Sequence, residues 1–229
     1  MEHGKRNKIM AIVAGGAILG VGGAFTLAAW TDTEWVFAGD GADGPGVATG
    51  IFEVQQDASQ PFDATGPTFA DFETNPGDEL TFGPGALVLV PGDVVYAPVA
   101  LRSTADSVAG TLQLNAAVAA TGITADDANN YLWDSLGLAV GYDIEVSGNQ
   151  PPNCDAAGFA SYTELTLTGT GLGATPATAT QPLSAASADI AHYCFQITMP
   201  ETLPGPLPLI NDLQGLSVAP AWLFDATSS

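Results

Sequence analysis

The chain has 229 residues and a formal net charge of −21 at pH 7, with 46% hydrophobic and 13% charged residues. The hydrophobic content excludes an intrinsically disordered chain, and the length is sufficient for one domain with a substantial core. The negative charge excludes nucleic acid and anionic lipid surfaces as partners, because both repel an acidic protein.

The first 30 residues have the parts of an export signal. Lys5, Arg6 and Lys8 precede an uncharged run over residues 9–29, which ends in small residues. Basic residues hold the start of the chain in the cytoplasm, and this order of segments is typical of a signal peptide. The run is also long enough to span a bilayer, which takes about 20 residues. Its glycines weaken a helix, so we expect a secreted or cell-surface protein, with membrane attachment through an uncleaved leader as the alternative.

Small residues at the end of the run locate the cleavage bond. A signal peptidase requires them at the first and third positions before the cut. Cutting after Ala28 places Ala28 and Thr26 there, whereas cutting after Ala29 places the bulkier Leu27 at the third position. We therefore expect residues 1–28 to be a signal peptide. Its removal takes away three basic residues and one acidic residue, so the mature charge is about −23.

Residues 29–46 are predicted to be a strand on a flexible tether. Residues 30–38 read WTDTEWVFA, and residues 39–46 read GDGADGPG, which has little preferred structure. Such an apolar strand can complete its own sheet or add to the exposed edge of another molecule. Head-to-tail addition does not close on itself and makes a filament. The residues assigned to this donor strand are Trp30, Asp32, Glu34, Trp35, Val36 and Phe37.

Residues 47–229 are predicted to form one antiparallel β-sandwich. Short runs of β-branched, aliphatic and aromatic residues alternate with Gly and Pro turns, and this spacing is typical of a sandwich. The run over 161–168 is expected to have one wet face, because Thr163, Leu165 and Leu167 alternate with polar residues. The expected strands are Val47–Val54, Ala86–Val90, Val94–Leu101, Val108–Val118, Leu138–Val146, Ser161–Thr168, His192–Met199 and Leu216–Phe224.

One short helix is expected between residues 124 and 136. Thr124 can cap it, Asp126 and Asp127 suit the positive end of its dipole, and apolar residues follow at helical spacing. Two stretches rich in Gly, Thr, Ala and Pro, Gly169–Ser187 and Pro200–Leu209, are expected to be surface connectors.

The chain contains two cysteines, Cys154 and Cys194, both in the predicted exported part. Oxidation is permitted outside the cytoplasm, so we expect one disulfide, with two buried free thiols as the alternative. The bridge would close a loop of about 41 residues and contribute on the order of 4 kcal/mol through chain entropy.

The sequence supplies few catalytic residues. After removal of the leader, His192 is the one remaining histidine, whereas a zinc peptidase typically needs two. A Ser-His-Asp arrangement would also have to use His192, and the sequence has no Gly-x-Ser-x-Gly nucleophile elbow. Asp40 and Asp43 resemble a fragment of a calcium loop without the rest of its pattern. No acidic pair stands out among the carboxylates. We predict no catalytic residue, no metal ligand and no cofactor.

Three segments carry a resemblance to a known family. The junction AAWTDTEWVFAGD resembles the leader and mature start of proteins processed by the SipW-type signal peptidase, a family that includes TasA and the camelysins. Ala48–Val54, reading ATGIFEV, is similar to the first core strand of that family. Leu89–Leu101, with its Pro-Gly-Asp turn, and the end from Leu213 to Ser228 are similar to later strands.

The resemblance implies a jelly-roll β-sandwich that is exported by a SipW-type signal peptidase and cleaved near Ala28. It also implies assembly with copies of itself into extracellular fibres of a biofilm matrix, by exchange of the donor strand. Camelysins are described as metallopeptidases, which makes a peptidase the less favoured alternative beside a monomeric surface or binding protein. The cysteine pair and the long acidic linker depart from the family pattern.

Overall fold

A computed structural model describes residues 42, 46–59, 68–146, 150–176, 178–203 and 208–229. The chain divides into two units, Met1–Ala48 and Thr49–Ser229. The first unit lies almost wholly outside the described residues. The predicted signal peptide, the cleavage residues Ala28 and Ala29, and the donor strand therefore lie outside them as well.

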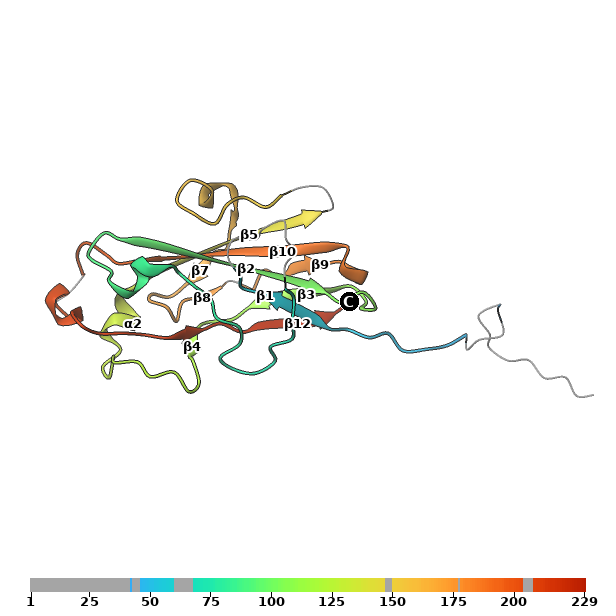
Figure 1. Cartoon of the computed structure of the whole chain (residues 1–229), viewed down its shortest axis with the longest axis horizontal. Coiled ribbons are helices and arrows are strands. Elements are labelled where there is room, and N and C mark those ends of the chain that lie inside the picture. Colours follow the sequence, from blue (N-terminus) through green and yellow to red (C-terminus); the bar gives the residue numbers. More distant parts are fainter. Residues whose placement is uncertain (1–41, 43–45, 60–67, 147–149, 177, 204–207) are drawn as a thin grey trace, which may run out of the picture. The chain divides into compact units, whose positions relative to one another are not determined.

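The second unit is an antiparallel β-sandwich, as predicted. Its two main layers are a five-stranded and a three-stranded sheet (Figure 1). The larger sheet has the order β1 (Val54–Asp57), β2 (Val94–Ser103), β10 (Asp189–Thr198), β5 (Gly137–Val146), β6 (Thr163–Glu164). The smaller sheet has the order β12 (Phe224–Ser228), β3 (Gly110–Leu114), β9 (Gln181–Leu183).

Short elements connect and cover these sheets. Two two-stranded ribbons extend the layers. One pairs β11 (Pro220–Ala221) with β4 (Val118–Ala119), and the other pairs β7 (Leu167–Thr168) with β8 (Thr175–Pro176). The helix α2 (Tyr131–Ser135) is the single α-helix of the described residues. The 3-10 turns are η1 (Pro84–Leu87), η2 (Phe159–Ser161), η3 (Ala185–Ser187) and η4 (Ile210–Leu213). None of the described helices is long and apolar enough to cross a membrane.

The core lies between the two sheets and follows from period-two alternation. On β10, Tyr193 and Phe195 are buried and face the smaller sheet, while Cys194 faces the other way. The tilted rings of Tyr193 and Phe224 have centroids 4.7 Å apart, and Phe195 contacts Trp222 at the same separation. Aromatic pairs at this separation add to the free energy gained by burial.

Three predicted strands are confirmed at nearly their predicted bounds, namely Val94–Leu101, Leu138–Val146 and His192–Met199. These three strands form the centre of the larger sheet. β10 pairs with β2 on one side and β5 on the other, so both of its edges are protected by the neighbouring strands.

Four other strand predictions need correction. The run 47–54 is extended, with a bridge at Ile51, and the strand begins at its last residue. Residues 86–90 are a 3-10 turn and a largely exposed loop instead of a strand, because no strand of the described residues pairs with them. The runs at 108–118 and 216–224 each break into two pieces that serve different sheets.

The run 161–168 also breaks. Leu165 is buried, but Thr163 on the same predicted face is exposed. β6 belongs to the larger sheet and β7 to a ribbon, so the chain leaves the edge between them.

The predicted helix is shorter than expected. Residues 124–130 are not helical, because Asp126 forms a bridge with Ser217 instead. Asn130 takes the cap position, so Thr124 does not cap the helix, and the Asp127 carboxylate accepts the backbone N–H of Trp133 at 2.8 Å.

The stretch Gly169–Ser187 is not a plain surface connector. It contains β8, β9 and η3, and it buries Leu172, Gln181 and Leu183. Apolar residues in this glycine-rich stretch supply part of the core, a role that the composition of the stretch does not indicate.

Candidate functional site

An open edge of the larger sheet forms the first part of the candidate site. β6 pairs with β5 at Gly141 and Tyr142, and the N–H of Leu165 donates to the carbonyl of Val140 at 2.8 Å. Beyond Leu165 the chain turns into β7, and no described strand continues along Gly137–Ala139. Backbone groups of alternate residues in a strand point to the same side. The backbone groups of Val140 point to β6. The N–H and C=O of Leu138, two residues earlier, therefore point to the same side of β5, which is the open edge.

A groove of about 920 Å³ lies beside this edge. Its lining combines apolar side chains with exposed threonines and glycines, and the lining residues Leu136 and Leu165 are buried. The residues that line it come from α2, β5, the β6–β7 segment, the 169–174 turn and the loop after β10; among them are Leu136, Leu138, Leu165, Thr166, Leu167, Thr170, Pro200 and Leu203. This is the size range of a pocket that accepts side chains of a ligand.

Gly171 allows one wall of the groove to pack against α2. Its φ is +72°, and a Cβ built at this position would lie 2.6 Å from the carbonyl oxygen of Trp133. The next residue, Leu172, donates its N–H to the same carbonyl at 3.0 Å. Only glycine combines this left-handed conformation with so close an approach, so the wall depends on that residue.

The groove and the N-terminal entry lie at opposite ends of the larger sheet. In the β5–β10–β2 ladder, Gly137 lies opposite Thr198, which lies opposite Val94; we call this the groove end. Ile51 bridges to Ser107 and Val54 pairs with Ser103; we call this the tether end. β2 connects the two ends with ten residues, a length of about 30 Å. In Figure 1 the entry of the chain lies on the right, beside the C-terminus, where β2 and β5 end.

No protein-family model and no curated protein sequence matches this chain. The features that bear on its function are therefore the open sheet edge, the groove and the polar clusters.

Exposed aliphatic side chains gather at the groove end. Leu87 is 89% exposed and Val88 is 73% exposed, in the loop that leads to the start of β2, followed by exposed Val90 and Val94. Exposed apolar groups in neighbouring positions are uncommon on a monomeric protein and mark contact surfaces.

The predicted disulfide is confirmed. Cys154 is bonded to Cys194, which is fully buried on the outer face of the larger sheet. The bridge holds the segment 150–162 against that face, where Phe159 contacts the ring of Tyr96 with centroids 5.8 Å apart. No catalytic dithiol chemistry follows from this arrangement, because one of the sulfurs is inaccessible.

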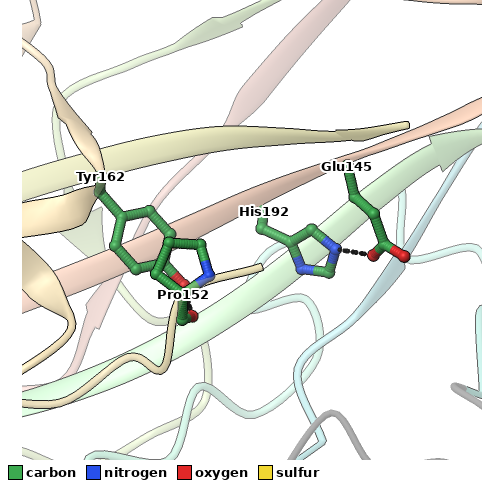
Figure 2. Close-up of polar contacts among 4 residues, drawn as sticks. All are labelled: Glu145, Pro152, Tyr162 and His192. Carbon is green, nitrogen blue, oxygen red and sulfur yellow. Dashed lines mark hydrogen bonds and ion pairs between the residues drawn. The ribbon is translucent and has the colours of Figure 1, made fainter. Parts of the chain in front are cut away.

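His192 lies on the same outer face and is buried. Its Nε2 is 2.7 Å from Oε2 of Glu145 (Figure 2). Burial lowers the pKa of His192, and the hydrogen bond and charge of Glu145 oppose this shift in part. A buried histidine held by a carboxylate of its own sheet is a packed polar pair.

Tyr162 closes the outer face near this pair. Its hydroxyl donates to the carbonyl of Pro152 at 2.6 Å (Figure 2). Burial, with smaller contributions from the charges of Asp143 and Asp155, raises the pKa of Tyr162 to about 12. The phenol is therefore a protonated structural donor at neutral pH.

Among the described residues, no three His, Cys, Asp or Glu side chains gather in a way that could hold a metal ion. Asp40 and Asp43, the fragment of a calcium loop, lie outside the described residues. So do Trp30, Asp32, Glu34, Trp35, Val36 and Phe37 of the predicted donor strand.

Sequence reasoning missed the groove. Its walls come from five segments between residues 134 and 208, and only the fold brings them together. The signal available in the sequence was the glycine-rich run Gly169–Gly173, since glycines in such runs permit close backbone approach.

Proposed function

We propose that this chain is a secreted structural protein that assembles into extracellular fibres by donor-strand exchange. In this proposal the mature segment Trp30–Ala38 of one copy adds to the open β5 edge of the next copy. The proposal makes the chain a member of the SipW-exported, TasA-like group, as its N-terminal resemblance implies. The observation that supports it best is the backbone of Leu138, which pairs with no described strand on its outer side and lies beside an apolar groove.

The side chains of the donor segment suit this groove. In a strand, Thr31, Thr33, Trp35 and Phe37 share one face, while Trp30, Asp32, Glu34 and Val36 share the other. The face of Trp35 and Phe37 would pack on Leu136, Leu165 and Leu203, and the carboxylates on the other face would remain in water. Burial of a large aromatic side chain contributes roughly 1.5–3 kcal/mol.

The polarity of the sheet supports docking between copies rather than within one. β5 runs from the groove end to the tether end, and all named ladders of the described residues are antiparallel. An antiparallel donor would therefore run towards the groove end and continue there into its linker. In its own molecule that linker would have to return about 30 Å to the tether end. In a stacked copy it would lead directly into the next tether end.

Deletion of residues 30–38 tests the donor role. We expect the shortened mature chain to keep the Tm of the full mature chain and to remain a single small species in light scattering. The full mature chain should form filaments visible by electron microscopy. A mutant that forms filaments of normal length would refute the donor role.

Cross-linking tests the acceptor groove. We expect Trp35→Cys in one preparation to form a disulfide with Thr166→Cys in another when the two are mixed, because the partners then belong to different copies. The control Asp106→Cys, on an exposed residue at the tether end, should not cross-link. A monomeric surface or binding protein predicts instead an intramolecular bridge in the double variant and none between copies.

A further inference from the structure

The smaller sheet has an open edge along its last strand, β12. On one side β12 pairs with β3, from Phe224 opposite Leu114 to Ser228 opposite Gly110. On its other side it pairs with no described strand. Residues 225–228 are exposed, so the backbone of another strand can reach this edge.

The ladder with β3 shows which backbone groups face the open edge. The N–H of Asn115 donates to the carbonyl of Leu223 at 2.8 Å, and the N–H of Ser229 donates to the carbonyl of Ala109 at 3.0 Å. Hydrogen-bonded pairs alternate along an antiparallel ladder, so the odd-numbered residues of β12 bond to β3. The backbone groups of the even-numbered residues therefore point to the open edge. These residues are Phe224, Ala226 and Ser228.

The opposite edge of the same sheet is protected by a proline. The even-numbered residues of β3 bond to β9, and their partners there are Gln181 and Leu183. The backbone of Pro182, between them, therefore points to the outer edge, where it has no N–H to donate. Proline and lysine on edge strands prevent pairing with another molecule. β12 has neither, and its register with β3 is continuous, so it lacks this protection.

The charge on β12 selects one register for pairing with a second copy. Because the outward-facing residues are even-numbered, the two-fold registers that keep most of the contact are centred on Asp225, Ala226 or Thr227. Centring on Asp225 places two carboxylates directly opposite each other, which is destabilising. Centring on Thr227 leaves Phe224 without a partner. Centring on Ala226 pairs every outward-facing residue through about six hydrogen bonds, and it places each Asp225 opposite Thr227 of the second copy.

The side chains of β12 also suit this register. The carboxylate of Asp225 accepts an N–H of the Asn115 side chain of its own copy at 2.9 Å. The three residues that follow, Ala226, Thr227 and Ser228, are small, so no bulky side chain obstructs the approach of the second strand.

We propose that β12 pairs antiparallel with β12 of a second copy, centred on Ala226, so that the two three-stranded sheets join into one continuous sheet. This contact goes beyond the donor-strand exchange proposed above and does not involve residues 30–38. It joins copies side by side through a two-fold axis, whereas donor-strand exchange joins them head to tail.

Cysteine cross-linking of the mature chain tests the register. The two native cysteines are bonded to each other, so the introduced thiols are the reactive ones. Directly opposite residues of a non-hydrogen-bonded pair are close together, so Asp225→Cys mixed with Thr227→Cys should form a disulfide-linked dimer. Each variant alone should cross-link about tenfold more slowly, because diagonal neighbours lie about 7–8 Å apart.

A matched pair of variants serves as the control for cross-linking. Ala156 is exposed in the segment 150–162, on the outer face of the larger sheet. Asp225→Cys mixed with Ala156→Cys should therefore cross-link no faster than either variant alone. The proposal is wrong if Asp225→Cys with Thr227→Cys reacts no faster than this control, or if either β12 variant alone reacts faster than their mixture.

Ala226→Pro tests the backbone hydrogen bonds. The N–H of Ala226 points away from β3, so proline removes a donor to the second copy and none to the β3 ladder. We expect dimerisation of the soluble mature chain to weaken about tenfold, because both copies lose a donor. Sedimentation at several protein concentrations in about 0.15 M salt, which screens the repulsion between acidic copies, measures the change. The control Ala226→Ser keeps the N–H and should dimerise as the unsubstituted chain does. Equal dimerisation of folded Ala226→Pro and Ala226→Ser would overturn the proposal.

Charge substitutions decide the question if the proline variant does not fold. Thr227→Asp places a carboxylate opposite Asp225 of the second copy, whereas Thr227→Lys places an ammonium there. We expect Thr227→Lys to dimerise about tenfold more tightly than Thr227→Asp, and Ala156→Lys and Ala156→Asp to differ much less. Equal effects at the two positions would contradict the pairing. The donor-strand test uses Trp35 and Thr166 instead, so either proposal can fail without the other.

Discussion

Nε2 of His192 lies 2.7 Å from Oε2 of Glu145, although Asp143 is the residue directly opposite His192 in the β10–β5 ladder. The histidine thus contacts the diagonal neighbour, at a distance that long side chains span across antiparallel strands. Burial lowers the pKa of His192 from its ordinary value of 6.5, and Glu145 and Asp143 oppose the shift.

This shift predicts a loss of stability in mild acid. Because the pKa of His192 is lower in the folded state, the unfolded chain binds the proton first as the pH falls below about 6.5. The stabilisation of the folded state by neutral His192 is therefore complete above about pH 6.5 and declines as the pH falls below that value. We expect Tm to fall more steeply between about pH 8 and pH 5.5 in the wild type than in His192→Gln, whose amide can still donate to Glu145. Parallel Tm profiles for the two proteins would contradict the prediction.

Loss of the disulfide should destabilise the fold without destroying the core. Cys154 and Cys194 are 40 residues apart, and releasing a loop of that size costs about 4 kcal/mol in the chain-entropy model. We expect the Cys154→Ala, Cys194→Ala double variant to lose about 2–4 kcal/mol in denaturant unfolding. The wild type treated with reductant should approach the same midpoint. A variant as stable as the oxidised protein would show that the bridge contributes nothing.

Alanine substitutions at two glycines of β5, Gly141 and Gly137, should have different effects on stability. A Cβ at Gly141 would lie 2.5 Å from the Cβ of Tyr162, whereas a Cβ at Gly137 would meet Thr198 at 3.5 Å, an ordinary contact. Gly141→Ala must push the segment 150–162 away from the sheet and should cost about 1–3 kcal/mol. Gly137→Ala should be close to neutral. Thermal unfolding of both variants measures the difference, and equal Tm values would contradict the close packing at Gly141.

The buried hydroxyl of Tyr193 should contribute more to the stability of the fold than the hydroxyl of Tyr142, the residue opposite it in the β10–β5 ladder. It donates to Oε1 of Gln181 at 3.0 Å, and Gln181 is itself buried. Tyr193→Phe leaves that oxygen without its donor, which should cost about 1–3 kcal/mol. Tyr142 is the control, since its hydroxyl has no hydrogen bond within the described residues and Tyr142→Phe should change stability little. Equal losses in chemical denaturation would show that the Tyr193 hydrogen bond is not stabilising.

The central strands could be predicted because the residue pattern within each segment by itself indicates a strand. β2, β5 and β10 each contain a long run of β-branched, aliphatic or aromatic residues between turn formers. These strands lie in the middle of the larger sheet, where burial agrees with the local preference of the residues. The disulfide was predictable for a simpler reason, because the chain has only two cysteines.

Segments at the periphery could not be predicted in the same way. Ala86–Val90 has the composition of a strand but forms a turn and a largely exposed loop, with which no described strand pairs. Residues 124–130 have helical spacing, yet Asp126 bonds to Ser217, a residue 91 positions later in the chain. Such pairings depend on which segments meet in space, and tertiary contacts then override a weak local preference.

The sequence by itself determined the class of the domain, its central strands, its acidic charge and the identity of its disulfide, because each depends on composition or on the residues of one segment. The tertiary structure decided where no described strand pairs with β5 and how five segments form the groove beside that edge. These features are made by residues far apart in the chain, and only the packing of the sheets and of α2 brings them together.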